Sequence, residues 1–387
     1  MKIRTFFLSG LSTAALVFTS YLPAADATRA DIESIEQLGQ MLYFDANLSL
    51  NRSQSCATCH EPSFGFIDNR DNGVDSAVSL GDDGKSLGDR NAPTLSYASF
   101  SPSFHINNEG EFVGGQFLDG REVDLAGQAG KPFLNPIEMA MPDKAAVVER
   151  LKENKQYITA FIRFYGEDIF NQPAKAYNAM TNSIAAFENS DFFSPFDSKY
   201  DRHLRGEYTM TTEEDLGMTL FFSEKSTNCT LCHQLKKSPA AEGETFTSYD
   251  YDNIGVPVNI RVRKLNGLET AIDHGLLQNP AVTDKQHDGK FKTSTLRNVA
   301  VTGPYMHNGV FRDLRTVVLF YNKYNSRSAR RQINPETGKT WAKPEVDGTL
   351  PIEELETGPA LKDEEIDALV AFMKTLTDAR FEHLLQP

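Results

Sequence analysis

The stretch Cys56-Ala57-Thr58-Cys59-His60 decides how this chain is built. A Cys-x-x-Cys-His run attaches a c-type haem: the two thiols become thioethers, and the histidine ligates the iron from the proximal side. The same run recurs at Cys229-Thr230-Leu231-Cys232-His233, and the two runs together use all four cysteines. One run alone could be chance, a redox dithiol or half of a zinc site, but two runs with no cysteine left over are hard to explain in these ways. The sequence therefore predicts two covalently attached c-type haems.

The composition is that of a folded, acidic protein. The chain has 387 residues, of which 40% are hydrophobic and 24% charged, enough for about two domains with packed cores. The formal net charge of -14 argues against nucleic acid and against an anionic membrane surface as partners, because like charges repel. A basic protein partner fits this charge, but an acidic surface also serves solubility alone.

The N-terminus has the pattern of an export signal. Lys2 and Arg4 form a basic end, and residues 6–18 are mostly apolar. Ala25-Asp26-Ala27 offers a small-x-small cleavage site. The apolar segment is too short to span a bilayer comfortably, although an uncleaved anchor stays an alternative. We therefore expect residues 1–27 to be a cleaved signal peptide and the mature protein to be periplasmic, without a membrane segment. No disulfide is expected in that oxidising compartment, because the thiols carry haem.

Helical periodicity recurs in both halves of the chain. Apolar residues at intervals of three and four, together with capping residues, predict helices over 31–46, 142–151, 174–188, from 212 onward, and over 363–376. Each half therefore offers a helix followed by Cys-x-x-Cys-His. We predict a mainly α fold with two cytochrome c-like domains, residues 28–200 and 201–387, each carrying one covalently attached haem.

Two segments lack helical signals. Residues 61–120 are rich in Gly, Asp, Asn, Ser and Pro, which is typical of irregular structure. Loops of this length in a compact domain are usually functional or wrapped around a cofactor. Residues 326–350, which hold the single tryptophan Trp341, are predicted to form a surface loop.

Several further stretches resemble the bacterial di-haem cytochrome c peroxidases. They are Gly114-Gly-Gln-Phe-Leu-Asp-Gly-Arg121, Leu134-Asn-Pro-Ile-Glu-Met139 and Ser294-Thr-Leu-Arg-Asn-Val-Ala-Val-Thr-Gly-Pro-Tyr-Met-His-Asn-Gly309. Within that family the chain looks most like the MauG branch, through Gly81-Asp-Asp-Gly84, Ser194-Pro-Phe-Asp-Ser-Lys-Tyr-Asp201, Asn253-Ile-Gly-Val-Pro-Val-Asn259 and Leu319-Phe-Tyr-Asn-Lys-Tyr324. The resemblance covers nearly the whole mature chain.

The resemblance implies a di-haem oxidase that uses hydrogen peroxide, or oxygen plus electrons, to form a high-valent di-haem state. It implies as substrate the precursor of methylamine dehydrogenase, whose tryptophans are oxidised to complete the tryptophan tryptophylquinone cofactor. One alternative is a periplasmic cytochrome c peroxidase that reduces hydrogen peroxide with electrons from a small cytochrome c or cupredoxin. A plain di-haem electron carrier is a further alternative.

Tyr321 stands where, by the resemblance, ordinary family peroxidases place a methionine as sixth ligand to the second haem. The resemblance therefore implies that His233 and Tyr321 together ligate this iron. A phenol oxygen is a hard ligand that stabilises ferric and higher oxidation states, whereas a soft thioether favours ferrous iron. From the residues alone, Tyr321 reads better as a core aromatic, because Val317 and Phe320 share its helical run.

Three residues are implied at the open side of the first haem, whose iron His60 would ligate. Glu138 lies where the family keeps an acid/base, and a carboxyl away from water could hold a proton at neutral pH and move it between peroxide oxygens. Gln128 matches a family glutamine that hydrogen-bonds in this pocket, and Pro132 matches a residue that fills space over the iron. From sequence alone, a helix-capping carboxylate before Met141 is the better interpretation of Glu138.

Two more features follow from the resemblance. Many family peroxidases block the first haem with a histidine that follows the first motif, but residues 75–90 contain no histidine. We therefore expect the first haem to be five-coordinate without activation. A calcium ion between the domains is also implied, bound by Asn91 and the backbone oxygens of Thr302 and Pro304, which are hard ligands that suit Ca²⁺. Without the resemblance, Asn91 would read only as part of a turn.

The chain departs from the MauG pattern at two tryptophans. Leu118 replaces one that lies between the haems, and Thr227 replaces one at the surface that faces the protein substrate. Because leucine and threonine are not readily oxidised, electron transfer from substrate to haem by this route is in doubt. Phe117, Tyr249 or Tyr251 are candidate substitutes.

Overall fold

The computed structural model describes residues 31–223, 225–238 and 241–385. From Ile32 onward the chain forms one compact unit. The predicted signal peptide, residues 1–27, lies outside the described residues. The predicted division near residue 200 stays a prediction. No described helix has both the length and the apolar character that crossing a bilayer requires.

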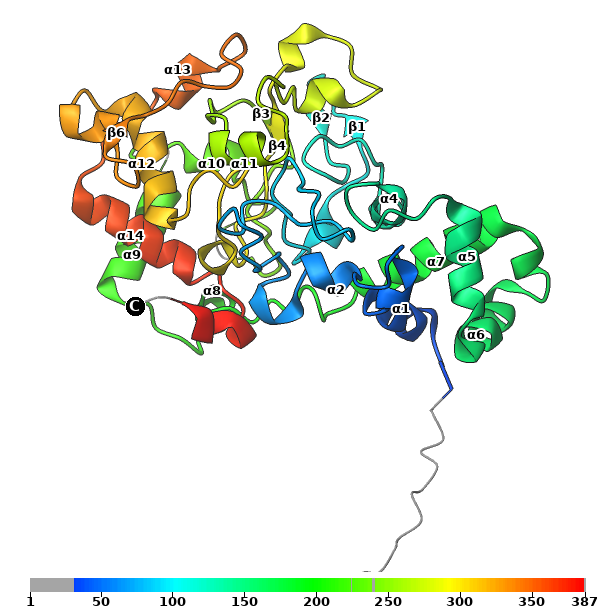
Figure 1. Cartoon of the computed structure of the whole chain (residues 1–387). Coiled ribbons are helices and arrows are strands. Elements are labelled where there is room, and N and C mark those ends of the chain that lie inside the picture. The colour runs from blue at the N-terminus through cyan, green and yellow to red at the C-terminus, as the bar shows by residue number, and fades with distance from the viewer. Residues whose placement is uncertain (1–30, 224, 239–240, 386–387) are drawn as a thin grey trace, which may run out of the picture. The chain divides into compact units, whose positions relative to one another are not determined.

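The described residues are mainly helical, as predicted, and the chain runs from blue to red in Figure 1. The α-helices are α1 (Ile35–Tyr43), α2 (Cys56–Cys59), α3 (Leu125–Ala129), α4 (Lys131–Leu134), α5 (Lys144–Lys152), α6 (Lys155–Tyr165), α7 (Pro173–Glu188), α8 (Lys199–Leu204), α9 (Thr212–Phe221), α10 (Cys229–Cys232), α11 (Ile260–Leu265), α12 (Leu314–Asn325), α13 (Ile352–Leu355) and α14 (Asp363–Lys374).

The strands of the described residues are two residues long and pair as antiparallel hairpins or bridges. They are β1 (His105–Ile106) with β2 (Phe112–Val113), β3 (Tyr251–Asp252) with β4 (Phe291–Lys292), and β5 (Ile333–Asn334) with β6 (Lys339–Thr340). The regular elements of residues 61–120 are short 3₁₀ turns, the β1–β2 hairpin and isolated bridges such as Leu80 with Leu87, so the prediction of irregular structure there is confirmed. The segment 326–350 is mostly exposed, but it contains the β5–β6 hairpin and is not a plain loop.

The predicted helices exist, and their starts follow from capping side chains. Asp143 accepts a hydrogen bond from Ala146 N at the start of α5, and Thr211 forms a reciprocal capping box with Glu214 at the start of α9. The first helix is shorter than predicted, because Ser34 is its N-cap and the chain leaves helical geometry after Tyr43. Helix α6 was not predicted from the sequence, and it packs beside α5 and α7.

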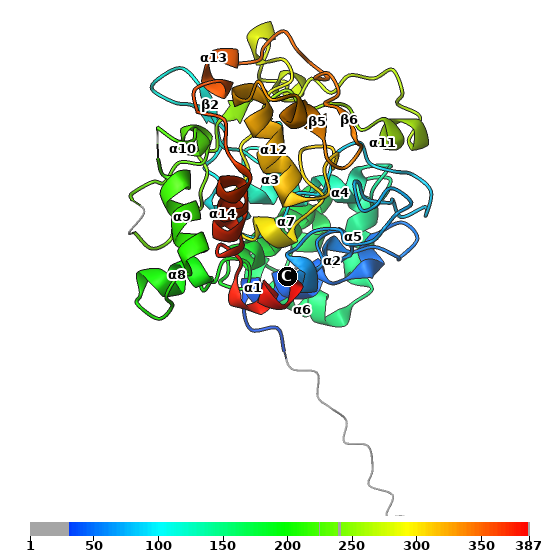
Figure 2. The ribbon, with the colours of Figure 1, turned by 90° about the vertical axis from the view of Figure 1, so that its left-hand side faces the viewer.

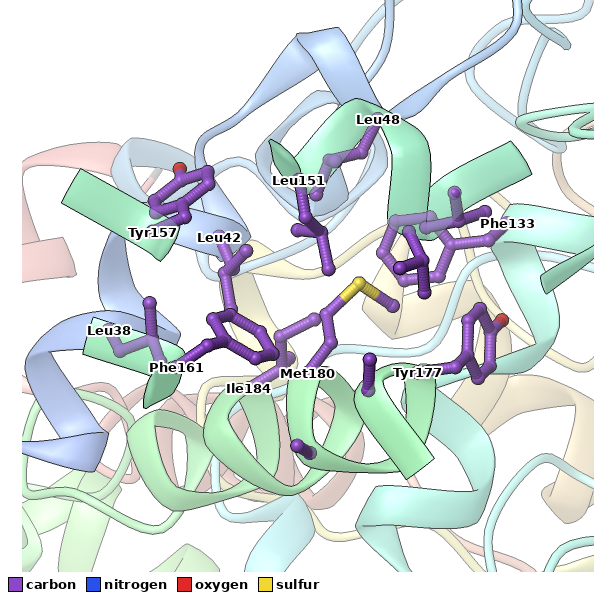
Figure 3. Close-up of a cluster of buried hydrophobic side chains, with 14 of the residues drawn as sticks. Leu38, Leu42, Leu48, Phe133, Leu151, Tyr157, Phe161, Tyr177, Met180 and Ile184 are labelled. Atoms are coloured by element: carbon purple, nitrogen blue, oxygen red, sulfur yellow. The ribbon is translucent and has the colours of Figure 1, made fainter. Parts of the chain in front are cut away.

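Helices α1, α5, α6 and α7 gather on one side of the described unit (right in Figure 1), and α9, α12 and α14 gather on the other. Helix α1 crosses α7 at Gly39, where an added Cβ would lie only 1.8 Å from the carbonyl oxygen of Ser183. Around this crossing, side chains of both helices and of α5 and α6 form a buried apolar cluster (Figure 3). Met180 of α7 points into its middle, toward Leu151.

The second half repeats this helix crossing. Helix α9 crosses α14 at Gly217, where an added Cβ would lie 1.9 Å from the carbonyl oxygen of Ala368. The two helices lie side by side in Figure 2. The repeat is visible in the sequence as Leu38-Gly39-Gln-Met-Leu-Tyr-Phe44 and Leu216-Gly217-Met-Thr-Leu-Phe-Phe222. Each half therefore places a glycine-mediated helix crossing ahead of its Cys-x-x-Cys-His run.

Candidate functional site

One large cavity, of about 710 Å³, reaches both Cys-x-x-Cys-His runs. It is walled by the irregular segments between the two helix groups rather than by the helix groups themselves. Residues of its wall include Cys56, Cys59 and His60 of the first run, and Cys232 and His233 of the second. Every residue that the sequence analysis assigned to the open haem, to the phenol ligand or to calcium also lines this cavity: Glu138, Gln128, Pro132, Tyr321, Asn91, Thr302 and Pro304.

The two motif histidines are oriented in the same way. His60 Nδ1 lies 3.2 Å from the carbonyl oxygen of Phe66, and His233 Nδ1 lies 3.0 Å from that of Phe246. A carbonyl oxygen only accepts, so Nδ1 carries the hydrogen in both rings and Nε2 keeps its lone pair for a metal. Burial lowers the pKa of both histidines, which favours this neutral form.

The backbone that holds each histidine is duplicated as well. Phe66 and Phe246 are fully buried and both have left-handed backbone, at φ 59° and 55°, which is unusual for a bulky side chain. The carbonyl just before each phenylalanine accepts a threonine hydroxyl at 2.6 Å, from Thr94 in the first half and from Thr295 in the second. The chain thus builds two equivalent cradles for a histidine-ligated group.

The thiols of both runs fit covalent attachment to haem. All four cysteines are free, and burial raises the pKa of Cys56, Cys229 and Cys232 above the usual thiol value. Burial likewise raises the pKa of Cys59 to about 11. These thiols therefore lack the stabilised thiolate that a redox dithiol needs. Together with the Nε2 atoms of His60 and His233, they make the residues present suitable for two c-type haems.

Tyr321 lies on α12 and lines the same cavity as His233. Burial raises the pKa of its phenol well above the usual value, and the Cys232 and Cys229 thiols beside it add to that effect. Deprotonation of this phenol would therefore require a cation in the cavity. The placement is compatible with a ligand role at the second haem, which stays a prediction.

Glu138 follows α4 on a turn rather than in a helix. The alternative that it caps a helix is wrong, because the N-cap of α5 is Asp143. Burial raises the pKa of its carboxyl and the nearby Asp89 adds to this, while a hydrogen bond with Asn135 and the charge of Arg121 oppose it. A carboxyl in this position keeps its proton to a higher pH than an exposed glutamate does.

The implied calcium ligands surround one part of the same cavity. Asn91 Nδ2 donates to the carbonyl of Ala77 at 3.1 Å, and its backbone N–H donates to the carbonyl of His307 at 2.7 Å. Its Oδ1 is thereby left for another partner. Among the described residues, no group of three or more His, Cys, Asp or Glu side chains forms a metal site, so any cation here would rest on amide and carbonyl oxygens.

The positions of the two missing tryptophans differ in exposure. Leu118 lines the cavity, and its carbonyl accepts from Lys292 N at 2.9 Å. The expectation that position 227 faces outward is wrong for this chain, because the Thr227 side chain is buried and its hydroxyl donates to the Leu220 carbonyl at 2.8 Å. Of the candidate substitutes, Phe117 and Tyr249 line the cavity.

Sequence reasoning missed several charged or polar residues of the cavity wall. Glu188, at the end of α7, is buried with one carboxyl oxygen unpartnered, and burial raises its pKa to about 8. Burial lowers the pKa of Lys292 to about 8. Neither residue lies in a recognisable motif, so only the folded chain reveals them. Asn135 lies within the quoted stretch 134–139, and its contact with Glu138 could have been suspected from their spacing.

The duplicated cradles, the like-oriented motif histidines and the shared cavity define a di-haem c-type oxidoreductase. Comparison with known proteins agrees with this class, since the family model for di-haem cytochrome c peroxidase matches residues 33–209. The chain is 50% identical over 380 residues to the methylamine utilization protein MauG of Paracoccus denitrificans, covering 98% of this chain and 97% of that protein. It therefore belongs to the di-haem cytochrome c peroxidase/MauG family.

Two other relatives show the breadth of that family. The cytochrome c peroxidase Ccp of Escherichia coli is 32% identical over 274 residues, which cover 70% of this chain and 49% of that protein. The crystal structure of the diheme peroxidase BthA from Burkholderia thailandensis matches with a TM-score of 0.80 and 30% identity, covering 91% of this chain and 88% of that one. The mainly α fold predicted from the sequence is thus shared with a solved di-haem protein.

Proposed function

We propose that this chain oxidises tryptophans of precursor methylamine dehydrogenase and so completes the tryptophan tryptophylquinone cofactor. The observation that carries the proposal is the 50% identity to MauG over nearly the full length of both chains. The phenol of Tyr321 supports the proposal. It lines the cavity and offers a hard oxygen ligand, whereas a haem that stores an electron as ferrous iron would need a soft ligand. Hydrogen peroxide, or oxygen plus electrons, supplies the oxidising equivalents.

The two haems, when bound, supply the reaction with peroxide and the storage of its oxidising equivalents. The chain binds them through the cysteines of both runs, and His60 and His233 each present Nε2 to an iron. Glu138 would take and return a proton in the part of the cavity that the first haem would occupy, a role for which its raised pKa suits it. Gln128 and Pro132 lie on the same wall and would orient or confine the oxidant.

The remaining predictions of the sequence analysis belong to the same proposal. Tyr321 would hold the second iron together with His233, and Asn91 with the Thr302 and Pro304 carbonyls would hold calcium. Residues 28–200 and 201–387 would act as the two haem domains. A periplasmic location, reached through a cleaved signal at residues 1–27, would supply the oxidising compartment in which such a precursor is matured.

Because two tryptophans of the MauG pattern are replaced, electrons must pass from the protein substrate to the haems by another route. The side chain of Leu118 lines the cavity, and leucine has no ring that can be oxidised. Tyr249 is the oxidisable aromatic side chain among the proposed substitutes that lines the cavity. We propose that activity survives with slower long-range transfer. Absence of a near-infrared charge-resonance band after peroxide addition would count against oxidation shared across Leu118.

The test is a choice of substrate. The purified di-haem protein is mixed with hydrogen peroxide and either precursor methylamine dehydrogenase or a reduced small cytochrome c. We expect the quinone absorbance to grow in the precursor and little cytochrome to be oxidised. Glu138→Gln should slow the reaction by about 10²- to 10⁴-fold, the usual contribution of a positioned acid/base. Glu149→Gln, an exposed carboxyl on α5, is the matched control and should leave the rate unchanged.

The alternative function is a cytochrome c peroxidase, which the Escherichia coli relative favours. Fast oxidation of the reduced cytochrome, with an unchanged precursor, would establish it. The plain electron carrier would show neither reaction. Genes for methylamine dehydrogenase beside this one would favour the first function before any protein is purified.

A further inference from the structure

The stretch Gly81-Asp82-Asp83-Gly84 has no role in the site described so far. It forms the tip of a tight loop that is closed by a bridge between Leu80 and Leu87 and by a hydrogen bond from Gly81 N to Ser86 O of 2.8 Å. Asp82 is 6% exposed although it lies at a loop tip, whereas Asp83 beside it is exposed. A buried carboxylate on a loop needs several donors to offset its desolvation.

The donors come from the turn that leads into the first haem-attachment run. The Asp82 carboxylate accepts hydrogen bonds from the Ser49 hydroxyl at 2.7 Å, from the Ser53 hydroxyl at 2.6 Å and from the backbone N–H of Asn51. Burial alone would raise the pKa of Asp82, but these bonds together lower it. The charged carboxylate of Asp82 is therefore the shared acceptor that holds residues 49–53 in place, shortly before Cys56.

The same loop also holds the backbone of Glu138. Asp82 N donates to the Glu138 carbonyl at 2.8 Å, and Leu50 N donates to the neighbouring Met139 carbonyl at 2.9 Å. The contact with Gly81 is close, because an added Cβ there would lie 2.6 Å from the Ile137 carbonyl oxygen. Residues 137–139 are thus fixed both to the loop and to the turn that Asp82 organises.

We propose that Asp82 is a positioning residue for Glu138: it ties the backbone of Glu138 to the turn before Cys56 and so sets the place of the Glu138 carboxyl over the first haem. This inference rests on the role of Glu138 in the proposed function. In the folded chain the Glu138 carboxyl faces Asn135, Asp89, Arg121 and the Cys59 thiol. A looser backbone would let water reach this group and return its pKa toward the ordinary value.

The experiment compares pH profiles of the second-order reaction of the ferric di-haem protein with hydrogen peroxide, followed in the Soret band. The relevant transition is the one that Glu138→Gln removes. In Asp82→Asn we expect this transition at lower pH and the rate reduced at least tenfold. Asp83→Asn is the matched control, because its carboxylate accepts only from Lys85 and Ser86 within the loop, and it should leave the transition where it is.

Two further measurements keep the inference testable if Asp82→Asn folds poorly. Ser53→Ala removes one donor and keeps the carboxylate, so it should shift the transition in the same direction by less. Amide hydrogen exchange should rise in residues 49–54 and 135–141 of Asp82→Asn but not of Asp83→Asn. A transition unmoved in both Asp82→Asn and Ser53→Ala would overturn the inference while leaving the role of Glu138 intact. A transition that survives Glu138→Gln would overturn the role of Glu138, and the inference with it.

Discussion

Tyr97 and Asn298 hydrogen-bond the same carboxylate, that of Asp378, although they lie in different halves of the chain. Both have left-handed backbone, at φ 59° and 62°, and each follows the threonine of its haem cradle by three residues. The hydroxyl of Tyr97 lies 2.5 Å from Asp378 Oδ1, and Asn298 Nδ2 lies 2.8 Å from Oδ2. The C-terminal segment therefore joins equivalent points of the two cradles.

Replacing Asp378 should destabilise the protein strongly. Asp378→Ala removes the acceptor of the Tyr97 hydroxyl and of one N–H of the Asn298 amide, whose nitrogen keeps its bond to Ser96 Oγ. Each buried donor left without an acceptor costs about 1–3 kcal/mol. We expect the free energy of unfolding, measured by denaturant titration of the di-haem protein, to fall by several kcal/mol. Asp197→Ala is the control, because among the described residues that carboxylate accepts from Ala379 N alone, at an exposed site. Equal effects of the two substitutions would contradict the joining role.

The two helix crossings should be intolerant of any side chain. In Gly39→Ala or Gly217→Ala the new Cβ would lie within 1.9 Å of a carbonyl oxygen of the partner helix, so the helices must separate. Overpacking of this kind typically costs about 1–3 kcal/mol and occasionally more. Thermal melts of the holoprotein measure the loss. Gly348→Ala, where nothing lies within 4 Å of the new Cβ, should change stability by no more than about 0.5 kcal/mol.

The helices and haem-attachment runs were predictable because their signals are local. The Asp143 and Thr211 caps and the two Cys-x-x-Cys-His runs are read directly from neighbouring residues. The repeat around Gly39 and Gly217 was also present in the sequence but carries meaning only once the partner helices are known. The burial of Glu188 has no local signal, because it depends on segments that are distant in the chain and meet only in the fold.

The hydrogen bond from the Thr94 hydroxyl to the Gly65 carbonyl could not be predicted from the sequence either. A threonine in an irregular segment gives no indication of its acceptor, which lies 29 residues away. The family resemblance supplied the positions of Glu138 and Tyr321, and the structure added their neighbours. Residues that act through others, such as Asp82, were quoted only as part of a motif, since positioning depends on several long-range hydrogen bonds at once.

Exchange of the phenol at position 321 should change the second haem. Because a thioether favours ferrous iron more than a phenol oxygen does, Tyr321→Met should raise the midpoint potential of that haem. Axial ligands span about 0.8 V, so a rise on the order of 0.1–0.3 V is expected. Spectroelectrochemical titration of the purified protein measures it.

The control for this exchange lies one helical turn further along α12. Tyr324 donates its hydroxyl to the Ile254 carbonyl at 3.0 Å and does not line the cavity. Tyr324→Phe should therefore lower stability by about 1 kcal/mol and leave both potentials unchanged. If Tyr321→Met leaves the potentials as they are in the unmodified protein, Tyr321 is a core aromatic and not a ligand.

Glu188 should make the protein less stable as the pH rises. Its folded-state pKa of about 8 exceeds the value of about 4.3 for an unfolded glutamate. Between these values the folded state binds more protons than the unfolded state, so the free energy of unfolding falls with increasing pH, by up to about 1.4 kcal/mol per unit. Above about pH 8 both states are ionised and this contribution becomes constant. Glu188→Gln removes the dependence, because an amide does not titrate.

Denaturant titrations of the holoprotein between about pH 5 and about pH 8.5 test this sign. The covalent haems stay attached in the unfolded state, so the comparison involves protons and not loss of cofactor. Glu188→Gln should gain stability relative to the unmodified protein steadily across this range. Glu149→Gln, whose side chain is 68% exposed, should run parallel to the unmodified protein. If the stability of Glu188→Gln instead ran parallel to that of the unmodified protein, the Glu188 carboxyl would be ionised at neutral pH. Its carboxyl oxygen, which is unpartnered in the fold, would then have a partner.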